Sequence, residues 1–515
     1  MATAFVLSVL AGIISAFVLK YGLKTLGWLA SRLCDMIPSR YHPPEKPGDN
    51  HIQILVLGDI GRSPRMQYHA ISFAKHGRKV DIVAYKGKDQ ILGALFLTVS
   101  LANRMHSVRA ETSRHPDLIG NERVSLYALA PQPEWIAWGT LPFFLNIPCK
   151  VMQQFWTLLY TMMWATPAAQ WIIIQVSSEG AKRTSHTMDL LTWPQNPPSI
   201  PTFHVALLVS WIRGSKVVID WHNYGHTILA QKPLYAILVP FYRWYEIFLG
   251  KFLGNVNLAV TDAMARELRG ARFNLKNPVH TLHDRPAHLF QPITSRKARE
   301  EFLSRLPQTK SHFKDIMDGH MRLIVSSTSW TPDEDFSMLI EALVSYANPH
   351  EGDGTSEPPS PILAIITGKG PEKEKYVEMI KQMQEGGRLP GVKILTAWLS
   401  NREYASLLAS ADLGISLHKS SSGVDLPMKV VDMFGAGLPV AAYSAFESFG
   451  ELVKEGENGC GFETADQLKN IFGRLFSEEG QDELAKLKRG AIKEGSLRWD
   501  EEWDRVMASI IGLSD

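Results

Sequence analysis

The stretch SSSGVDLPMKVVDMFGAGLPVAA, residues 420–442, constrains the fold more than any other part of this chain. Small residues and a proline precede a short run with helical spacing, which a glycine-containing turn separates from a new apolar strand. The first amides of such a helix lack intrahelical acceptors and carry partial positive charge, so they suit an anion such as a diphosphate. Asp432, further into the helix, is placed to accept a hydrogen bond from a ribose. An ordinary core segment would show the same local pattern.

Length and composition define the class of protein. A chain of 515 residues exceeds a single core, which predicts two domains. The 54 basic and 52 acidic residues nearly balance, and no basic stripe with interleaved aromatic residues occurs, so nucleic acid is not an expected partner. The three cysteines are odd in number and far apart, which argues against a disulfide framework or a metal cluster, and we assign no metal ligands.

The N-terminus has the composition of a membrane anchor. Residues 2–19 carry no charge and approach the ~20 apolar residues that cross a bilayer, so residues 1–24 are predicted to form a transmembrane helix. Basic residues follow this run and none precedes it, which predicts that the rest of the chain is cytosolic. A cleavable signal peptide is the alternative, but the charged segment that should begin it is missing. Residues 25–50, with several prolines, are predicted to be a tether.

The first domain is predicted to span residues 51–288. A strand-like run at 52–57 ends in GDIGRSPR, and helical spacing follows over 66–76, as in the opening unit of a Rossmann-like sheet. The turn lacks the G-x-G-x-x-G fingerprint of dinucleotide folds. Gly61, Arg62 and Arg65 instead favour a phosphate on the acceptor side, although solvated arginines after a structural turn would look the same.

Two segments of this domain are unusually apolar. Residues 91–102 and the aromatic-rich residues 135–174 are too often interrupted by proline to be clean transmembrane spans. Aromatic side chains favour the headgroup level of a bilayer, so these segments are predicted to lie on a membrane. The alternative is a thick aromatic core.

A histidine follows another short strand, at 217–219, in the motif DWHNYGH. His222 therefore lies at the carboxyl end of a strand, where ligands bind in such sheets, and its imidazole titrates near neutral pH. Asp220, Asn223 and Tyr224 beside it are able to orient it or to hold sugar hydroxyls. Upstream, Asn196 lies in the proline-rich loop QNPPSIPT.

The second domain is predicted to span residues 289–495, after a crossing at 281–286. Strands are expected at 323–326, 362–367, 392–395 and 413–417, alternating with helices. The second of them ends in GKGP, where Gly368 and Lys369 are able to reach a diphosphate, although this is no Walker loop. Residues 496–515 are expected to be a helix returning to the first domain. The chain is thus α/β, with two doubly wound Rossmann-like domains facing a cleft.

Several strings together carry a family resemblance. GDIGRSPRMQYHA, QNPPSIPT, IDWHNYGHTI, SSTSWTPDED, ITGKGP, SADLGISLHKSSSGVDLPMKVVDMFGAGLPV and ELVKEGENG occur in order between about residues 52 and 462. They resemble the eukaryotic chitobiosyldiphosphodolichol beta-mannosyltransferases, the GT-B fold glycosyltransferases of N-glycan precursor assembly. The chain departs from that pattern by insertions at 178–193, 301–318 and 349–360, which are expected to be loops.

The resemblance implies an activity and its partners. A member of this family transfers mannose from GDP-mannose to O4 of the outer GlcNAc of GlcNAc2-diphosphodolichol, with inversion to a beta-1,4 link. This is the first mannosylation of the precursor. The implied place is the endoplasmic reticulum membrane, with a single span and cytosolic catalytic domains, near other lipid-linked oligosaccharide glycosyltransferases. No bound cofactor is required, and assistance by a divalent metal stays open.

Inversion requires a general base, and the charge that develops on the departing diphosphate requires stabilisation. We consider Asp59 and His222 as the base, with Asp220 and the acids at 333–335 as further possibilities. The predicted donor site consists of Arg285, Gly368, Lys369, Ser421, Ser422, Leu426, Met428, Lys429 and Asp432. The predicted acceptor site consists of Gly61, Arg62, Arg65, Asn196, Asn223 and Tyr224. A retaining GT-B mannosyltransferase of the same pathway and a non-catalytic scaffold for such enzymes are the alternatives.

Overall fold

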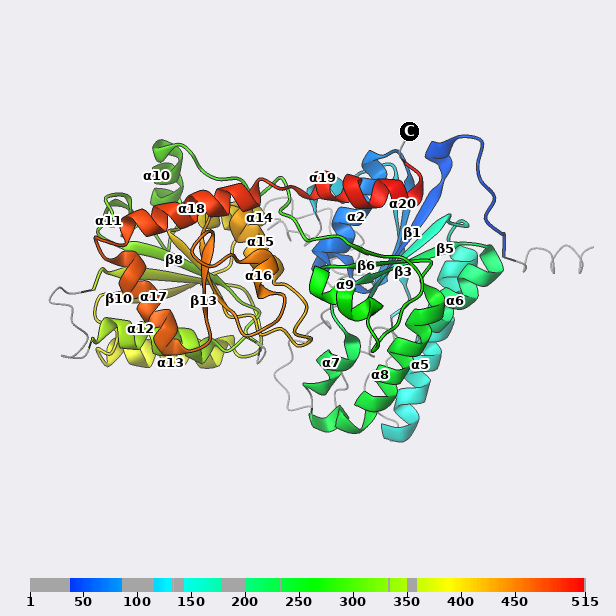
Figure 1. The fold of residues 1–515 in the computed structure, drawn as a ribbon, viewed down its shortest axis with the longest axis horizontal. Coiled ribbons are helices and arrows are strands. Elements are labelled where there is room, and N and C mark those ends of the chain that lie inside the picture. The colour runs from blue at the N-terminus through cyan, green and yellow to red at the C-terminus, as the bar shows by residue number, and fades with distance from the viewer. Residues whose placement is uncertain are drawn as a thin grey trace, which may run out of the picture.

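The computed structural model describes residues 38–85, 115–131, 133, 143–176, 200–231, 233–331, 334–349 and 359–513. These residues form two parallel-sheet α/β domains joined side by side (Figure 1). The predicted anchor at 1–24, the segment 91–102, the insertion 178–193 and Asn196 lie outside the described residues. Within the described part of the chain, no helix is long and apolar enough to cross a membrane.

The first domain contains a parallel sheet with the order β3-β2-β1-β4-β5-β6-β7. Its short apolar runs are buried on both faces, as is usual in parallel sheets. The order reverses between β1 and β4, and ligands bind at such a switch point. The strands are β1 (His51–Asp59), β2 (Lys79–Tyr85), β3 (Val124–Leu129), β4 (Trp171–Val176), β5 (Lys216–Trp221), β6 (Val256–Ala259) and β7 (Val279–Thr281).

Helices cover both faces of this sheet. One core cluster joins the sheet to the layer formed by α5, α6, α8 and α9, and another joins it to α2 and the C-terminal helices. Short helical turns η1 (Pro47–Asp49), η2 (Ile60–Arg62), η3 (Pro116–Leu118), η4 (Thr161–Ala165) and η5 (Pro233–Leu238) connect the elements. The helices are α2 (Pro64–Lys75), α5 (Phe143–Tyr160), α6 (Thr202–Arg213), α7 (Gly225–Ala230), α8 (Val239–Leu253) and α9 (Asp262–Arg269).

The second domain contains a parallel sheet with the order β10-β9-β8-β11-β12-β13. The predicted strand-helix alternation and all four predicted strands are confirmed. The strands are β8 (Arg322–Ser327), β9 (Ile362–Thr367), β10 (Val392–Ala397), β11 (Leu413–Ser416), β12 (Val440–Tyr443) and β13 (Gly459–Phe462). The helices are α10 (Arg296–Arg305), α11 (Phe313–Met317), α12 (Phe336–Ala347), α13 (Lys373–Glu385), α14 (Asn401–Ser410), α15 (Met428–Gly435), α16 (Phe449–Leu452), α17 (Ala465–Phe476) and α18 (Gln481–Gly495).

One predicted loop of this domain is helical. Residues 301–318 include the end of α10 and all of α11, and Phe302, Leu303 and Ile316 are buried in the core. The expectation of a plain loop insertion was wrong because these apolar side chains give the segment a buried face.

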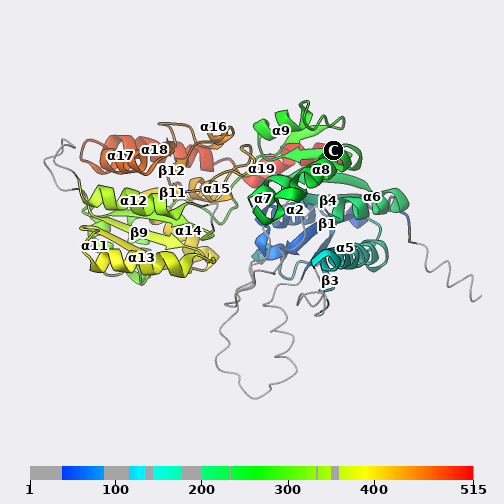
Figure 2. The ribbon, with the colours of Figure 1, turned by 90° about the horizontal axis from the view of Figure 1, so that it is seen from below.

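The chain ends by crossing back to the first domain (Figure 2). After α18 it forms α19 (Trp499–Trp503), η6 (Asp504–Ala508) and α20 (Ser509–Ile511). The indole of Trp499 donates to Ser72 Oγ at 3.0 Å, so α19 is held against α2. The two domains are therefore joined twice, by the crossing at 282–286 and by this returning segment.

The last residues of the predicted tether are not free. Arg213, at the end of α6, donates from Nε to the Ser39 carbonyl oxygen at 3.0 Å, and the Tyr41 amide donates to the Arg213 carbonyl oxygen at 2.7 Å. The hydroxyl of Tyr41 donates to Asn50 Oδ1 at 2.6 Å. The described residues 38–50 are therefore bound along the first domain by specific hydrogen bonds, which a tether would lack.

Candidate active site at the domain junction

The loop after β5 meets the loop after β11 across the domain boundary. Asn223 Nδ2 donates to Ser421 Oγ at 3.1 Å and to Asp425 Oδ2 at 3.0 Å. Both loops follow the carboxyl ends of parallel strands, where α/β sheets bind ligands. The predicted acceptor and donor motifs thus lie together, although Asn223 itself is occupied as a bridge between the domains.

His222 is paired with a carboxylate that was not among the predicted site residues. Its Nε2 lies 3.5 Å from Asp284 Oδ2, and 22% of the histidine side chain is exposed against 4% of the aspartate. Burial by itself lowers the pKa of His222, but the nearby Asp284 carboxylate outweighs burial and raises the pKa above its usual value. Asp284 therefore stabilises a protonated imidazole and leaves Nδ1 as the nitrogen that can take up a proton.

Arg65 binds the carboxylate oxygen of Asp284 that does not face His222. It is 1% exposed and donates to Asp284 Oδ1 at 2.5 Å, to both carboxylate oxygens of Asp220 at 2.7 and 3.0 Å, and to the Leu282 carbonyl oxygen at 3.1 Å. Although burial opposes ionisation, the charge of Arg65 holds the pKa of Asp284 at about 2. The prediction that Arg65 contacts an acceptor phosphate was wrong, because its guanidinium is buried between two carboxylates.

The same hydrogen-bonded cluster reaches the C-terminal helix. His69 Nε2 lies 3.3 Å from Asp220 Oδ2, and the indole of Trp503 donates to His69 Nδ1 at 3.0 Å. An acceptor at Nδ1 requires the neutral imidazole with its proton on Nε2, which agrees with a pKa lowered by burial. Trp503, His69, Asp220, Arg65 and Asp284 thus connect α19 with His222.

A second missed carboxylate organises the serine-rich loop. Asp425 is 3% exposed and lies within hydrogen-bonding distance of His418 Nε2 at 3.3 Å. Its Oδ1 accepts from the hydroxyls of Ser420 and Ser422. Burial opposes its charge, yet these partners keep the pKa of Asp425 below its usual value. The Ser422 hydroxyl therefore shapes the loop, and that of Ser421 bonds Asn223, so their backbone amides remain for a ligand.

The start of α15 is open to an anion. Its N-cap residue, Pro427, provides no side-chain hydrogen bond to the first amides, which include those of Met428 and Lys429. Lys429 Nζ is paired with Glu334 and lies 3.4 Å from Ser329 Oγ. The side chain of Leu426 is buried in the core, so only its backbone is available to a ligand.

The GKGP turn lies close to the loop after β8. Gly368 has φ +124°, and a Cβ there would come within 1.8 Å of the Thr328 carbonyl oxygen, so the two loops meet only because this residue is glycine. Lys369 is exposed, and its Nζ lies 3.7 Å from the centroid of the Trp398 ring. A lysine in this position is able to extend toward a diphosphate.

Asp432 lies at the domain junction as a largely buried acid. Burial, together with the charge of Asp284, raises its pKa well above the usual value. Burial chiefly, and the Asp432 carboxylate in addition, raise the pKa values of Tyr68 on α2 and Tyr404 on α14, so Asp432 lies near residues of both domains. A carboxyl group accepts hydrogen bonds from a hydroxyl in either protonation state, and the ribose role of Asp432 stays a prediction.

The remaining predicted residues have other structural positions. Arg285 Nη1 donates to Glu494 at 2.8 Å, so its charge is already neutralised and the predicted diphosphate role is not supported. Tyr224 is fully buried, with its ring 4.8 Å from that of Phe273, so it cannot contact an acceptor directly. Asp59 accepts from the Gly61 amide at 3.0 Å, which caps its own turn. The side chain of Arg62 lies outside the described residues.

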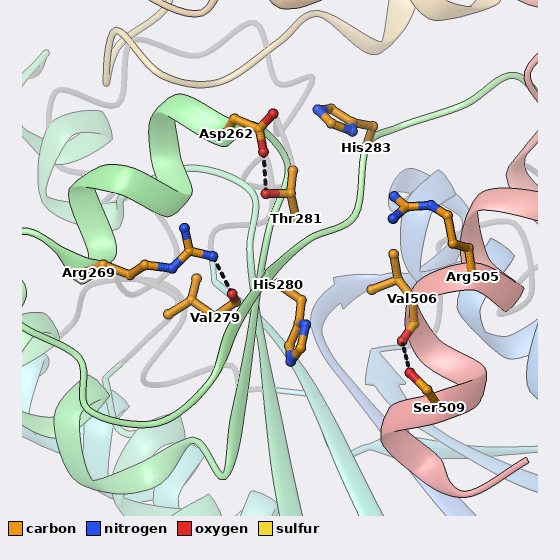
Figure 3. A pocket seen from close by; sticks show the side chains of 9 residues that line it. All are labelled: Asp262, Arg269, Val279, His280, Thr281, His283, Arg505, Val506 and Ser509. Atoms are coloured by element: carbon orange, nitrogen blue, oxygen red, sulfur yellow. Dashed lines mark hydrogen bonds between the residues drawn. The ribbon is translucent and has the colours of Figure 1, made fainter. Parts of the chain in front are cut away.

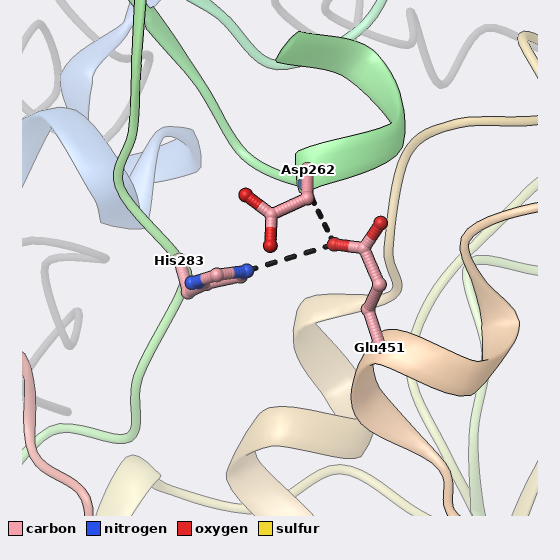
Figure 4. A group of neighbouring side chains, drawn as sticks. All are labelled: Asp262, His283 and Glu451. Carbon is pink, nitrogen blue, oxygen red and sulfur yellow. Dashed lines mark hydrogen bonds and ion pairs between the residues drawn. The ribbon is translucent and has the colours of Figure 1, made fainter. Parts of the chain in front are cut away.

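A second cluster of titratable residues lies beside α9. A pocket between α9, β7 and the C-terminal helices is lined by His280, His283 and Arg505, among others, and contains no predicted site residue (Figure 3). His283 Nε2 lies 3.6 Å from Glu451 (Figure 4). The other ring nitrogen, Nδ1, lies 3.4 Å from Glu502. Burial disfavours the charged imidazole, but these two glutamates outweigh burial and raise the pKa of His283 to about 9.

The group Asp262, His283 and Glu451 has metal-ligand chemistry, but its atoms are already engaged. Glu451 accepts the amides of Asp262 and Ala263 at 2.7 Å each, and Asp262 Oδ1 accepts from Thr281 Oγ1 at 2.6 Å. A protonated His283 has no lone pair for a metal ion. The cluster therefore acts as a polar clamp between α9, α16 and α19.

Two Rossmann-like domains that meet at the carboxyl ends of their strands define the GT-B class of glycosyltransferases. The chain matches the crystal structure of Anabaena HepE in complex with UDP and glucose at 16% identity, with a TM-score of 0.55 over 90% of this chain and 100% of the other. It matches the sucrose-phosphate synthase of Thermosynechococcus elongatus at 12% identity, with a TM-score of 0.56 over 90% and 100%. At such identities the likeness shows the fold alone.

Sequence relatives identify the family. The chain is 41% identical over 411 residues to the chitobiosyldiphosphodolichol beta-mannosyltransferase of Arthroderma benhamiae, which covers 78% of this chain and 85% of the relative. The Mus musculus protein of the same name is 35% identical over 493 residues, covering 90% and 89%. An Arabidopsis thaliana relative named UDP-glycosyltransferase TURAN is 36% identical over 501 residues, covering 89% and 96%. No protein-family model matches. The chain belongs to the chitobiosyldiphosphodolichol beta-mannosyltransferase family and is a glycosyltransferase enzyme.

Proposed function

We propose that this enzyme transfers mannose from GDP-mannose to O4 of the outer GlcNAc of GlcNAc2-diphosphodolichol, with inversion to a beta-1,4 link. The observation that carries the proposal is the pairing of His222 with Asp284 at 3.5 Å, beside the loop that leads to the open start of α15. A base on one side of the junction and an anion site on the other are what an inverting transfer requires.

In this proposal His222 is the general base. Nδ1 takes the proton from the acceptor O4 as that oxygen forms the new bond to C1 of mannose and the bond from C1 to the diphosphate breaks. Asp284 stabilises the imidazolium that results, while Arg65 keeps Asp284 charged. The amides that begin α15 and the Lys369 ammonium group receive the charge that the diphosphate carries away. Asp59, which caps its own turn, is the rival base.

The proposed place of action is the cytosolic face of the endoplasmic reticulum membrane, with residues 1–24 as a single-span anchor. The support is the uncharged run at 2–19 with basic residues only on its C-terminal side. The lipid-linked acceptor and other glycosyltransferases of the same precursor are the proposed partners there. Protease digestion of sealed microsomes tests the orientation: the two domains are expected to be degraded without detergent, and protection of them contradicts it.

Product analysis tests the function. The full-length chain in detergent receives a GlcNAc2-diphosphate carrying a short phytanyl chain and either GDP-mannose or UDP-glucose, with and without a chelator. We expect a beta-mannosyl product, identified by NMR, from GDP-mannose alone. An alpha product would establish a retaining enzyme, and transfer from UDP-glucose would overturn the proposed donor.

His222→Gln is expected to lower kcat by about 10²- to 10⁴-fold, because the proposed base is removed. His280 is an exposed residue of the neighbouring pocket, and His280→Gln is expected to leave kcat unchanged.

A further inference from the structure

Exposed aromatic side chains gather on one helical layer of the first domain. Apart from Trp398, every exposed large aromatic side chain of the described residues belongs to α5 with η4, to α6 or to α8. These three helices are neighbours, because α6 packs against both α5 and α8. The exposed aromatic side chains of this layer are Trp156, Tyr160 and Trp164 on α5 and η4, Trp211 on α6, and Phe241, Trp244, Phe248 and Phe252 on α8.

The aromatic residues of α8 form a single stripe. Phe241, Trp244, Phe248 and Phe252 follow one another at intervals of three or four residues, and they are between 45% and 63% exposed. Their ring centroids lie 5.9, 5.3 and 5.1 Å apart in succession. The opposite side of the helix is already buried in the core, so this stripe is a second apolar face that folding does not cover.

The charge of this layer selects the kind of partner. Within α5, α6 and α8 the only acidic residue is Glu246, and it is buried. Its carboxylate accepts from the Gly225 amide at 2.9 Å and contacts His226 Nδ1 at 2.6 Å. Arg243 and Lys251 lie beside the stripe in a shallow groove with Trp244 and Phe248. Cations and aromatic rings without an exposed carboxylate complement an anionic bilayer surface.

The aromatic layer is connected through the chain both to the N-terminal apolar segment and to the candidate active site, as a membrane-contacting layer should be. The described chain begins at residues 38–41, which Arg213 holds at the end of α6, two residues after the exposed Trp211. The uncharged run at 2–19 is therefore joined to this same layer through some twenty residues. At the other side, α7 leads from the His222 loop directly into η5 and α8.

We propose that the aromatic face formed by Phe241, Trp244, Phe248 and Phe252 of α8, extended by Trp156, Tyr160 and Trp164, docks on the interfacial region of a bilayer that contains anionic lipid. The rings lie at headgroup level, and Arg243 and Lys251 contact lipid phosphates. This docking orients the first domain toward a lipid-held acceptor, a consequence that rests on the proposed function, whereas the docking itself does not.

An environment-sensitive fluorophore tests the docking without any transfer reaction. Phe248→Cys is labelled with nitrobenzoxadiazole in the full-length chain, with Cys34, Cys149 and Cys460 changed to serine, and reconstituted in nanodiscs of phosphatidylcholine and phosphatidylserine. We expect its emission to shift to shorter wavelength and to brighten several-fold relative to nanodiscs of phosphatidylcholine alone. Val377→Cys, an exposed position on α13 of the other domain, is the matched control and is expected to stay unchanged.

Two results overturn the proposal. One is equal emission from positions 248 and 377 in both kinds of nanodisc. The other is an emission change at position 248 that appears in detergent without lipid and grows with protein concentration, because it would assign the stripe to a second copy of the chain. Product formation from the short-chain acceptor in detergent does not require docking, so failure of the docking and failure of the proposed function are distinguished.

Changing the stripe provides a second measurement. Phe241, Trp244 and Phe248 replaced together by serine are expected to raise KM for the long-chain acceptor in anionic nanodiscs several-fold. Turnover of the short-chain acceptor in detergent is expected to be unchanged. An unchanged KM in nanodiscs contradicts the proposal, provided that the variant shows the same unfolding midpoint as the wild type.

Discussion

His222 depends on neighbours that come from distant parts of the chain. The imidazole faces Asp284 at 3.5 Å, and Arg65 holds Asp284 against Asp220. Of these four residues, Arg65, Asp220 and Asp284 are almost fully buried, whereas part of the imidazole is accessible. An ion-paired interior with one accessible titratable group is the arrangement by which a protein adjusts a catalytic pKa.

The change Asp284→Asn is expected to lower kcat/KM by about 10²-fold, because the imidazolium loses its stabilising carboxylate. Since that charge raises the pKa of His222, the acid limb of the pH profile is expected to move to lower pH. Steady-state rates between pH 5 and 9 measure both effects. Asp59→Asn, the matched change, is expected to leave the acid limb in place. If Asp59→Asn removes the acid limb and Asp284→Asn leaves it at the same pH, Asp59 is the base.

Asp432 links ligand binding to stability. Asp432→Asn is expected to weaken donor binding about 10-fold by calorimetry, a loss of about 1.4 kcal/mol. Because the pKa of Asp432 is raised in the folded state, the wild type loses stability as pH rises from the usual aspartate pKa through the folded value. The Asp432→Asn variant has no carboxyl group to titrate, so it is expected to lack this loss. Urea unfolding of the wild type and the variant at pH 5 and pH 8 measures this pH-dependent change in the free energy of unfolding. Unchanged donor affinity would refute the ribose role.

Among the elements, α19 is the one that connects the end of the chain with the site. Its two indoles donate to α2, Trp499 to Ser72 Oγ and Trp503 to His69 Nδ1, each at 3.0 Å. The second bond selects the tautomer of His69 that faces Asp220. The contribution of α19 is thus a specific hydrogen-bond donor in addition to apolar packing.

Trp503→Phe is expected to lower the free energy of unfolding by about 1–3 kcal/mol, because it leaves the buried His69 Nδ1 without a donor. Trp499→Phe removes a similar bond, but the Ser72 hydroxyl is able to turn to a backbone carbonyl of α2, so we expect a smaller loss. Chemical denaturation of both variants gives the comparison. Equal losses would mean that only the indole rings, and not their donors, matter.

At the scale of the whole molecule, a polar clamp joins the two domains. His283 on the crossing segment lies between Glu451 of α16 and Glu502 of α19, while Glu451 also caps α9. The first domain, the second domain and the returning helix meet at this one imidazole. Protonation of His283 therefore contributes to how firmly the domains are held together.

His283→Gln is expected to remove a pH-dependent part of the stability. A histidine whose folded pKa is raised to about 9 contributes stability that is complete below its unfolded pKa of about 6.5 and is lost as pH rises through 9. Thermal unfolding between pH 6 and 10 should show this loss, up to about 3 kcal/mol, in the wild type but not in the variant. His280→Gln, exposed in the same pocket, is the control. Identical curves for His283→Gln and wild type would exclude the clamp.

The sequence determined the parallel α/β architecture and the place of the site. Short apolar runs such as 52–57 and 362–367, each followed by a glycine turn and helical spacing, have one stable packing in two doubly wound domains. Motifs at the carboxyl ends of strands then had to converge, as the loop after β5, through Asn223, and the loop at 420–425 do. The family resemblance was confirmed by relatives such as the Arthroderma benhamiae protein, which is 41% identical over 411 residues.

Only the tertiary structure decided which side chains are free to act. Arg65 and Arg285 looked like phosphate ligands, but their carboxylate partners Asp220, Asp284 and Glu494 come from distant segments. The role of Asp425 as the centre of its loop was likewise invisible in sequence. A local pattern specifies backbone geometry, whereas the availability of a charge depends on what the fold buries beside it, because an unpaired buried charge is too costly to persist.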